Sequence, residues 1–230
     1  MSDATAGGEV INPTDLKRVK DAAVAANIKI LENFFSFVIG FALTQATMKL
    51  VDTWTQAEVT KLPIGATVLY LALLLTIVPF YQGMSRFLYE THVVRPLEKP
   101  DARSSPMLLD IWAFMVMSCI IFAMGRFLND PTWFFYLWSL LLLIDIIWTL
   151  TVWWIQKSRV PKWALNNAIW LILAWGYWWA IHRTGFPTTI KPELLPALKY
   201  GFVVFEALRT VFDYWVNWKF YFPPEYRGAK

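Results

Sequence analysis

The chain has 230 residues, of which 57% are hydrophobic and 17% charged, and its formal net charge is only +4. Soluble domains typically carry about 25% charged residues, so this composition argues against a soluble globular protein. The basic residues form no single cluster, so we expect no nucleic-acid partner. Hydrophobic residues instead form long runs between short charged segments. This pattern is typical of a membrane protein whose first partner is the lipid bilayer.

The first 28 residues are the least apolar part of the chain and are predicted to form a cytoplasmic N-terminal segment. The sequence Asn12-Pro13-Thr14-Asp15 is a plausible helix start. A charged helical stretch then runs over residues 15–26, with a weak apolar face that would allow it to lie as a short amphipathic helix on the membrane surface. No apolar stretch precedes it, so no cleavable signal peptide is predicted.

Six later segments are each long enough to cross the hydrocarbon layer of about 30 Å, which requires roughly 20 helical residues. Residues 29–220 are therefore predicted to be an all-α, polytopic membrane helix bundle of six transmembrane helices, and residues 221–230 a cytoplasmic tail. The six predicted spans are Ile30–Val51, Leu62–Leu88, Pro106–Leu128, Pro131–Gln156, Trp163–His182 and Leu195–Trp218.

Two local features constrain this bundle. Only Asn129 and Asp130 separate the third and fourth spans, which predicts a tight antiparallel hairpin. Pro79 falls inside the second span, where it should kink the helix and leave one backbone carbonyl without its donor.

An even number of spans places both termini on one side of the membrane. Fourteen of the 21 Lys and Arg residues then lie on that side and six on the other, while Arg209 lies within the sixth span. Because Lys and Arg favour the cytoplasmic side, both termini are predicted to be cytoplasmic. The small size and the absence of a leader suggest a bacterial inner (plasma) membrane, and we expect a homo-oligomer.

Charged residues inside the predicted spans form the first candidate site. Arg209 lies midway along the sixth span, with Glu206 three residues before it and Asp213 four residues after it. Both carboxylates share a helix face with the guanidinium and can reach it. Asp145 lies at a similar depth in the fourth span and could pair with Arg209 or a neighbour. The network either fixes helix register as a structural unit or takes part in conduction or proton relay.

Small and polar residues on the first span form the second candidate site. They recur at spacings of three and four, so they share one helix face. Such a stripe lines a hydrated path in one interpretation, and in the other it lets a second helix pack closely. We call this set the α-stripe, and its members are Asn33, Ser36, Gly40, Thr44 and Thr47.

Polar residues at the end of the second span form a third candidate site. Gln82 and Arg86 fall near the cytoplasmic interface. Arg86 either extends to the lipid headgroups or contributes to a gate or an anion contact. Three tryptophans lie deeper in the membrane and either wall an apolar or cation-binding pocket or pack in the bundle; they are Trp148, Trp170 and Trp175.

No catalytic, metal or cofactor site is predicted. His92 and His182 have no second plausible metal ligand nearby, and the common hydrolase and phosphate-loop motifs are missing. We therefore expect no enzyme, although a membrane-embedded enzyme using Asp110 and Asp145 remains an open alternative.

The segment 31–44 resembles the first helix of the endosomal and lysosomal potassium-channel family and its bacterial six-helix homologues. In that family an Arg and a Phe-Ser-Asp triplet open the helix, and small apolar residues and a Thr follow. Ile30, Phe35 and Ser36 stand at the Arg, Ser and Asp positions here. The resemblance implies a tetrameric cation channel whose first helix lines the pore, with Ile39 or Leu43 at its constriction. The positions that keep the pattern are Leu31, Glu32, Phe34, Val38, Ala42 and Thr44.

The leading functional hypothesis is a passive channel for a monovalent cation, with the first helix lining the path. One alternative is a non-conducting membrane sensor or partner subunit. Another is a small-molecule carrier that uses Asp145 and Arg209.

Overall fold

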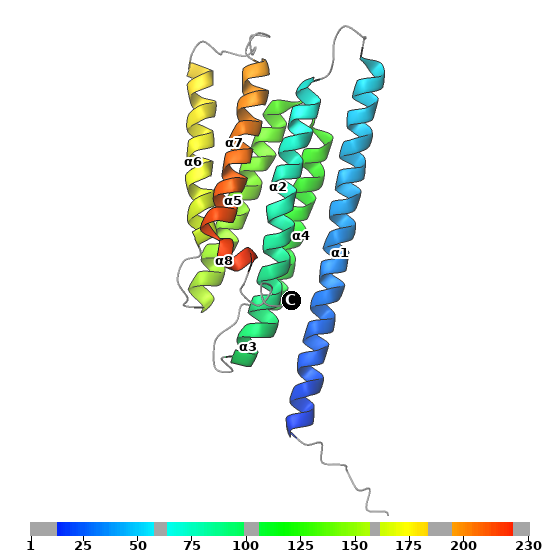
Figure 1. The fold of residues 1–230 in the computed structure, drawn as a ribbon, viewed down its shortest axis with the longest axis vertical. Coiled ribbons are helices and arrows are strands. Elements are labelled where there is room, and N and C mark those ends of the chain that lie inside the picture. Colours follow the sequence, from blue (N-terminus) through cyan, green and yellow to red (C-terminus); the bar gives the residue numbers. More distant parts are fainter. Residues whose placement is uncertain (1–12, 58–63, 99–105, 157–161, 184–194, 223–230) are drawn as a thin grey trace, which may run out of the picture.

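A computed structural model describes residues 13–57, 64–98, 106–156, 162–183 and 195–222. Every regular element within these ranges is a helix, which confirms the predicted all-α class (Figure 1). In chain order they are α1 (Pro13–Gln56), α2 (Ile64–Tyr89), the π-helix η1 (Glu90–Val94), α3 (Arg95–Glu98), α4 (Met107–Arg126), α5 (Pro131–Gln156), α6 (Lys162–Arg183), α7 (Leu195–Val216) and α8 (Trp218–Tyr221).

The six long helices form one bundle. Each helix contacts the next around a ring in the order α1, α4, α5, α6, α7 and α2, and α2 returns to α1. The start of α1 and the short α8 lie toward the same end of this bundle (Figure 1). Large buried side chains such as Phe35, Phe114 and Trp138 fill the interior.

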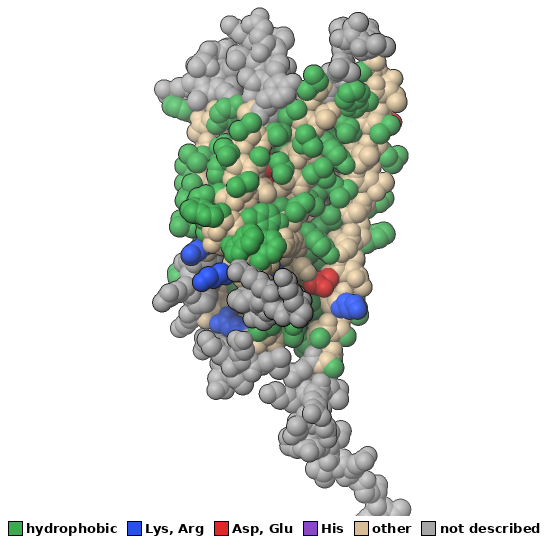
Figure 2. Space-filling view, viewed as in Figure 1, with side chains coloured by type: hydrophobic (Ala, Val, Ile, Leu, Met, Phe, Trp, Pro, Cys, Tyr) green, Lys and Arg blue, Asp and Glu red, His purple; other side chains and the backbone are tan. Residues whose placement is uncertain are grey.

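Four helical stretches among the described residues are long and apolar enough to cross a membrane, and they match the first four predicted spans. Their apolar surfaces indicate an integral membrane protein in contact with the lipid bilayer. Apolar side chains cover a broad band of the visible face, and Lys and Arg side chains lie below it (Figure 2). Composition does not establish a crossing by α6 or α7, because both carry buried polar side chains. The four stretches are Ala22–Gln56, Ile64–Val94, Met107–Arg126 and Pro131–Gln156.

α1 includes both the stretch expected to form a short amphipathic helix and the first predicted span. α1 runs without a break through the expected boundary at residue 28 and has 44 residues. The sequence around this boundary contains neither Gly nor Pro, so nothing there ends the helix. At the other end of the chain, α7 ends at Val216, two residues before the predicted end of the sixth span, and the tail from residue 223 lies outside the described residues.

Pro79 lies inside α2, and the helix continues through it. Proline has no N–H to donate to the carbonyl four residues earlier, which belongs to Leu75. The Thr210 hydroxyl of α7 donates to this Leu75 carbonyl at 3.1 Å. The Leu75 carbonyl therefore lacks its usual donor within α2, as predicted, and accepts a hydrogen bond from α7 instead. A buried backbone carbonyl in a membrane requires such a partner.

Two helix contacts explain the packing of α4. The predicted hairpin with α5 is confirmed, and the Asp130 carboxylate accepts from the N–H groups of Thr132 and Trp133 at 3.0 and 3.2 Å, which caps α5. Against α1, a Cβ atom at Gly125 would lie 3.3 Å from both the Ala42 carbonyl oxygen and the Ala46 Cβ. Glycine at this position lets the two helices approach closely.

Candidate functional site

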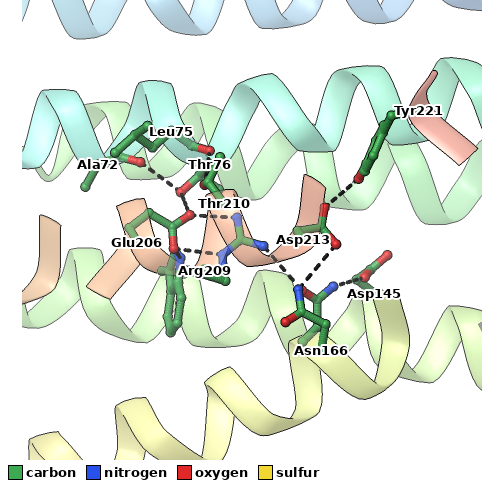
Figure 3. Close-up of polar contacts among 12 residues, drawn as sticks. Ala72, Leu75, Thr76, Asp145, Asn166, Glu206, Arg209, Thr210, Asp213 and Tyr221 are labelled. Carbon is green, nitrogen blue, oxygen red and sulfur yellow. Dashed lines mark hydrogen bonds and ion pairs between the residues drawn. The ribbon is translucent and has the colours of Figure 1, made fainter. Parts of the chain in front are cut away.

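Arg209 and Glu206 form the centre of a buried polar network (Figure 3). The Arg209 Nε and NH2 groups donate to the two Glu206 carboxylate oxygens at 2.8 and 2.7 Å. Both residues are buried on α7, with 5% of Arg209 and 0% of Glu206 exposed. Two parallel, charge-assisted hydrogen bonds are a strong arrangement, so the predicted pairing of these residues is confirmed.

Glu206 also links α7 to two other helices. The Thr76 hydroxyl of α2 donates to one carboxylate oxygen at 2.7 Å, and the Trp138 indole N–H of α5 donates to the other at 3.1 Å. The Glu206 carboxylate is therefore held by donors from three helices. Its position is fixed by the bundle and not by α7 alone.

Asp145 reaches the guanidinium through an amide. Arg209 NH1 donates to Asn167 Oδ1 at 3.3 Å, and the Asn167 amide donates to Asp145. The sequence predicted that Asp145 could pair with Arg209 or with a neighbouring residue. In the structure Asp145 pairs with a neighbouring residue, Asn167 of α6. Asn167 was not among the predicted site residues, although two consecutive asparagines in an apolar helix were a visible signal.

Asp213 lies near enough to Arg209 for their charges to interact, as the shared helix face predicted, but its described hydrogen bonds come from other residues. The Arg209 donors point toward Glu206 and Asn167, so Asp213 is held by neutral groups instead. Tyr221 of α8 donates to it at 2.6 Å, and burial raises the pKa of this phenol, which keeps the hydroxyl protonated. The other two donors are the amides of Asn166 and Asn217, at 3.3 and 2.8 Å.

The formal charges of this network do not balance. Glu206 and Arg209 compensate each other, whereas the contacts described for Asp145 and Asp213 come from neutral donors. An ionised carboxylate in a low-dielectric interior is costly without an opposite charge. Three carboxylates around one guanidinium therefore make this part of the bundle attractive to a proton or another cation.

A cavity lies beside the network. The space between its walls is about 620 Å³, a figure that includes the region open to the outside. Aromatic side chains from α2, α4, α5, α6 and α8 form most of the remaining wall. The charged and amide side chains that line the cavity are Asp145, Asn167, Arg209 and Asp213.

A further buried carboxylate, outside the Arg209 network, orients one wall of this cavity. Asp110 of α4 is 0% exposed and contacts His92 Nε2 of η1 at 2.8 Å. It also accepts from the Trp148 indole N–H at 2.9 Å. Trp148 lines the cavity and packs against Phe87 and Phe114, with ring centres 4.6 and 4.8 Å away. Sequence reasoning missed this cluster because no pattern predicted the π-helix that carries His92.

The α-stripe lies on the outside of the chain. All five of its residues are exposed, and a Cβ atom at Gly40 would have no neighbour within 4 Å. The Ser36 and Thr47 hydroxyls lie 2.6 and 2.8 Å from the Tyr81 and Tyr70 hydroxyls of α2. The stripe therefore flanks α2 and does not support close packing against another helix among the described residues.

The remaining predicted residues lie apart from the network. Gln82 accepts a hydrogen bond from the Tyr214 hydroxyl at 2.7 Å. Arg86 forms an ion pair with Glu90, one helical turn away. Ile39 is buried within the chain, so it does not share the exposed face of the α-stripe.

The described residues contain no group of three or more His, Cys, Asp or Glu side chains placed to hold a metal ion. No protein family, curated protein or solved structure matches this chain. The site therefore has to be interpreted from its own chemistry. It is a buried, cation-attracting network beside a cavity in an all-helical bundle with membrane-spanning character.

Proposed function

We propose that this membrane protein binds a small cation inside its helix bundle and carries it across the bilayer. The observation behind this proposal is the charge imbalance beside the cavity, where Glu206, Asp145 and Asp213 share the charge of Arg209, which forms its hydrogen bonds to a carboxylate with Glu206. A network that served only to hold helices together would be more stable with its charges matched. This is the carrier alternative of the sequence analysis, with Asp145 as the main binding group.

The proposal includes six membrane crossings. α6 and α7 have 22 residues each, which corresponds to about 33 Å of helix and matches the hydrocarbon thickness. Among the described side chains, Asn166 and Asn167 of α6 and Glu206, Arg209 and Asp213 of α7 are buried, whereas apolar side chains of both helices are exposed, which is the arrangement that lipid favours. The exposed apolar residues include Leu165, Ile169 and Ile172 on α6 and Val204, Leu208 and Val211 on α7.

The same geometry supports an orientation. α1 begins at the end of the bundle that carries α8, as six crossings require (Figure 1). On the visible face, Lys and Arg side chains lie toward this end (Figure 2). Positive charge favours the cytoplasm, so we assign this end to the cytoplasm and the protein to a bacterial inner membrane.

A passive cation channel between copies of the chain is the second candidate function. The exposure of the α-stripe favours it, because exposed polar residues on a lipid-facing helix can line a path only where several copies meet. This arrangement would correspond to the potassium-channel resemblance of the first helix. It requires a homo-oligomer in which α1 faces the central axis.

Ion flux into liposomes separates these functions. Under the carrier proposal, Asp145→Asn should abolish K⁺, Na⁺ or H⁺ flux and Thr44→Leu should leave it unchanged, since Thr44 lies on the outer face. Under the channel proposal, Thr44→Leu should reduce the flux and Asp145→Asn should not. Protein-containing liposomes that show no more flux than empty ones would contradict both and favour the non-conducting sensor or partner subunit.

A further inference from the structure

We propose that the cavity binds an amphipathic organic ammonium ion, a protonated amine with a small apolar or aromatic group, in preference to an alkali-metal ion. This inference rests on the proposed interior cation site and specifies its ligand class. It depends on three features of the cavity: a carboxylate oxygen of Asp145 that can accept a hydrogen bond, a small number of oxygen atoms able to coordinate a metal ion, and an aromatic wall.

Asp145 provides the acceptor for the ammonium group. Asn167 occupies one oxygen of this carboxylate, so the second oxygen can accept from a bound donor. Asp145 lines the cavity, and its neighbour Arg209 directs two of its hydrogen bonds to Glu206. A charge-assisted hydrogen bond from an ammonium group to Asp145 would therefore balance one of the two excess carboxylates.

The oxygen atoms at the cavity are too few for an alkali-metal ion. Such an ion has to replace a hydration shell with several protein oxygens. Here the two Asp213 oxygens together accept three hydrogen bonds, and Asn167 Oδ1 accepts one from Arg209. An ammonium group has lower demands, because it needs only a few acceptors and is also attracted to aromatic faces.

The aromatic wall fits the apolar part of such a ligand. The indole N–H groups of Trp148 and Trp163 already donate to Asp110 and Thr149, at 2.9 and 3.0 Å. These bonds fix the rings and leave their carbon surfaces to the cavity. Five elements contribute rings to this wall, namely Phe80 and Phe87 from α2, Phe114 from α4, Trp148 from α5, Trp163 from α6, and Phe220 and Tyr221 from α8.

Binding of benzylammonium to the purified protein in detergent tests the inference by titration calorimetry and by ligand-dependent thermal unfolding. Benzyl alcohol, which has the same ring without the charge, should bind at least about tenfold more weakly, as expected for one charge-assisted contact. KCl and NaCl at equal ionic strength should give no saturable binding. Equal affinity for the amine and the alcohol, or tighter binding of K⁺ or Na⁺, would overturn the inference.

Asp145→Asn should weaken benzylammonium about tenfold and leave benzyl alcohol unchanged. The control on the same helix is Thr151→Val, because Thr151 is not part of the cavity lining and its hydroxyl bonds to the Ile147 carbonyl. Thermal unfolding of each variant without ligand shows whether it is folded. Unchanged benzylammonium binding in folded Asp145→Asn would contradict the role of this residue.

The liposome assay keeps this inference separate from the proposed function. Asp145-dependent flux of K⁺, Na⁺ or H⁺ without benzylammonium binding would reject the ligand class and leave the interior cation site standing. Benzylammonium binding without flux of benzylammonium itself or of K⁺, Na⁺ or H⁺ would support the site and reject transport. If neither is observed, both proposals fail.

Discussion

Replacing Arg209 by methionine should destabilise the protein strongly, because it removes the cation that Glu206 binds. Methionine is apolar and comparable in length, so the packing of α7 changes little. The Glu206 carboxylate would remain fully buried with only the Thr76 and Trp138 donors. Asn167 Oδ1 would also lose the hydrogen bond that it accepts from Arg209. Removing one partner of a buried ion pair typically costs about 3–5 kcal/mol.

The free energy of unfolding in detergent, from chemical denaturation, measures this cost. Arg86→Met is the matched control, since the Arg86–Glu90 pair is partly exposed and should contribute no more than about 1 kcal/mol. The double variant Glu206→Gln with Arg209→Met should recover most of the loss, because it removes both charges and keeps an acceptor for Thr76. A loss below about 1 kcal/mol in Arg209→Met, or a double variant no more stable than the single one, would refute the reasoning.

Three further variants test the packing of the bundle by the same unfolding measurement. Thr210→Val should lower the free energy of unfolding by about 1–3 kcal/mol, because the Leu75 carbonyl loses its donor. Adding Pro79→Ala to this variant should reduce the loss, because residue 79 then has an N–H that can donate to Leu75. Gly125→Val should cost about 1–3 kcal/mol by pushing α1 from α4, whereas Gly40→Val should have little effect on packing, because its surroundings are open. Tyr221→Phe should cost about 1.5–3 kcal/mol by removing a donor to a carboxylate. Equal stability of the parent and Thr210→Val, Gly125→Val or Tyr221→Phe would contradict the corresponding contact.

The sequence predicted the features that depend on chain length and local chemistry. Apolar runs gave the all-α class and the first four apolar spans. The short connection at Asn129 and Asp130 predicted the α4–α5 hairpin. The missing N–H of Pro79 predicted that the Leu75 carbonyl would need a donor from outside α2. These inferences need no knowledge of which helices are neighbours, since each follows from the backbone of one segment.

Features that depend on the relative rotation of helices were not predictable in the same way. Helical spacing placed Asp213 within reach of Arg209, but the guanidinium turns toward Glu206 and an amide of α6. Spacing also defined the α-stripe as one face without showing whether that face was internal or exposed. Likewise, the contact between His92 and Asp110 joins the π-helix η1 to α4, and the sequence pattern predicted neither the π-helix nor this pairing.

The contact between Thr210 and Leu75 has a consequence for how the chain enters the membrane during synthesis. The two residues are 135 positions apart, so the carbonyl in α2 lacks its final donor until α7 has been made. α7 in turn carries four charged residues and depends on groups such as Thr76 and Trp138, which have been inserted before it. Biogenesis should therefore leave α2 transiently incomplete, and a ribosome stalled before α7 should yield a nascent chain that proteases and quality-control factors recognise.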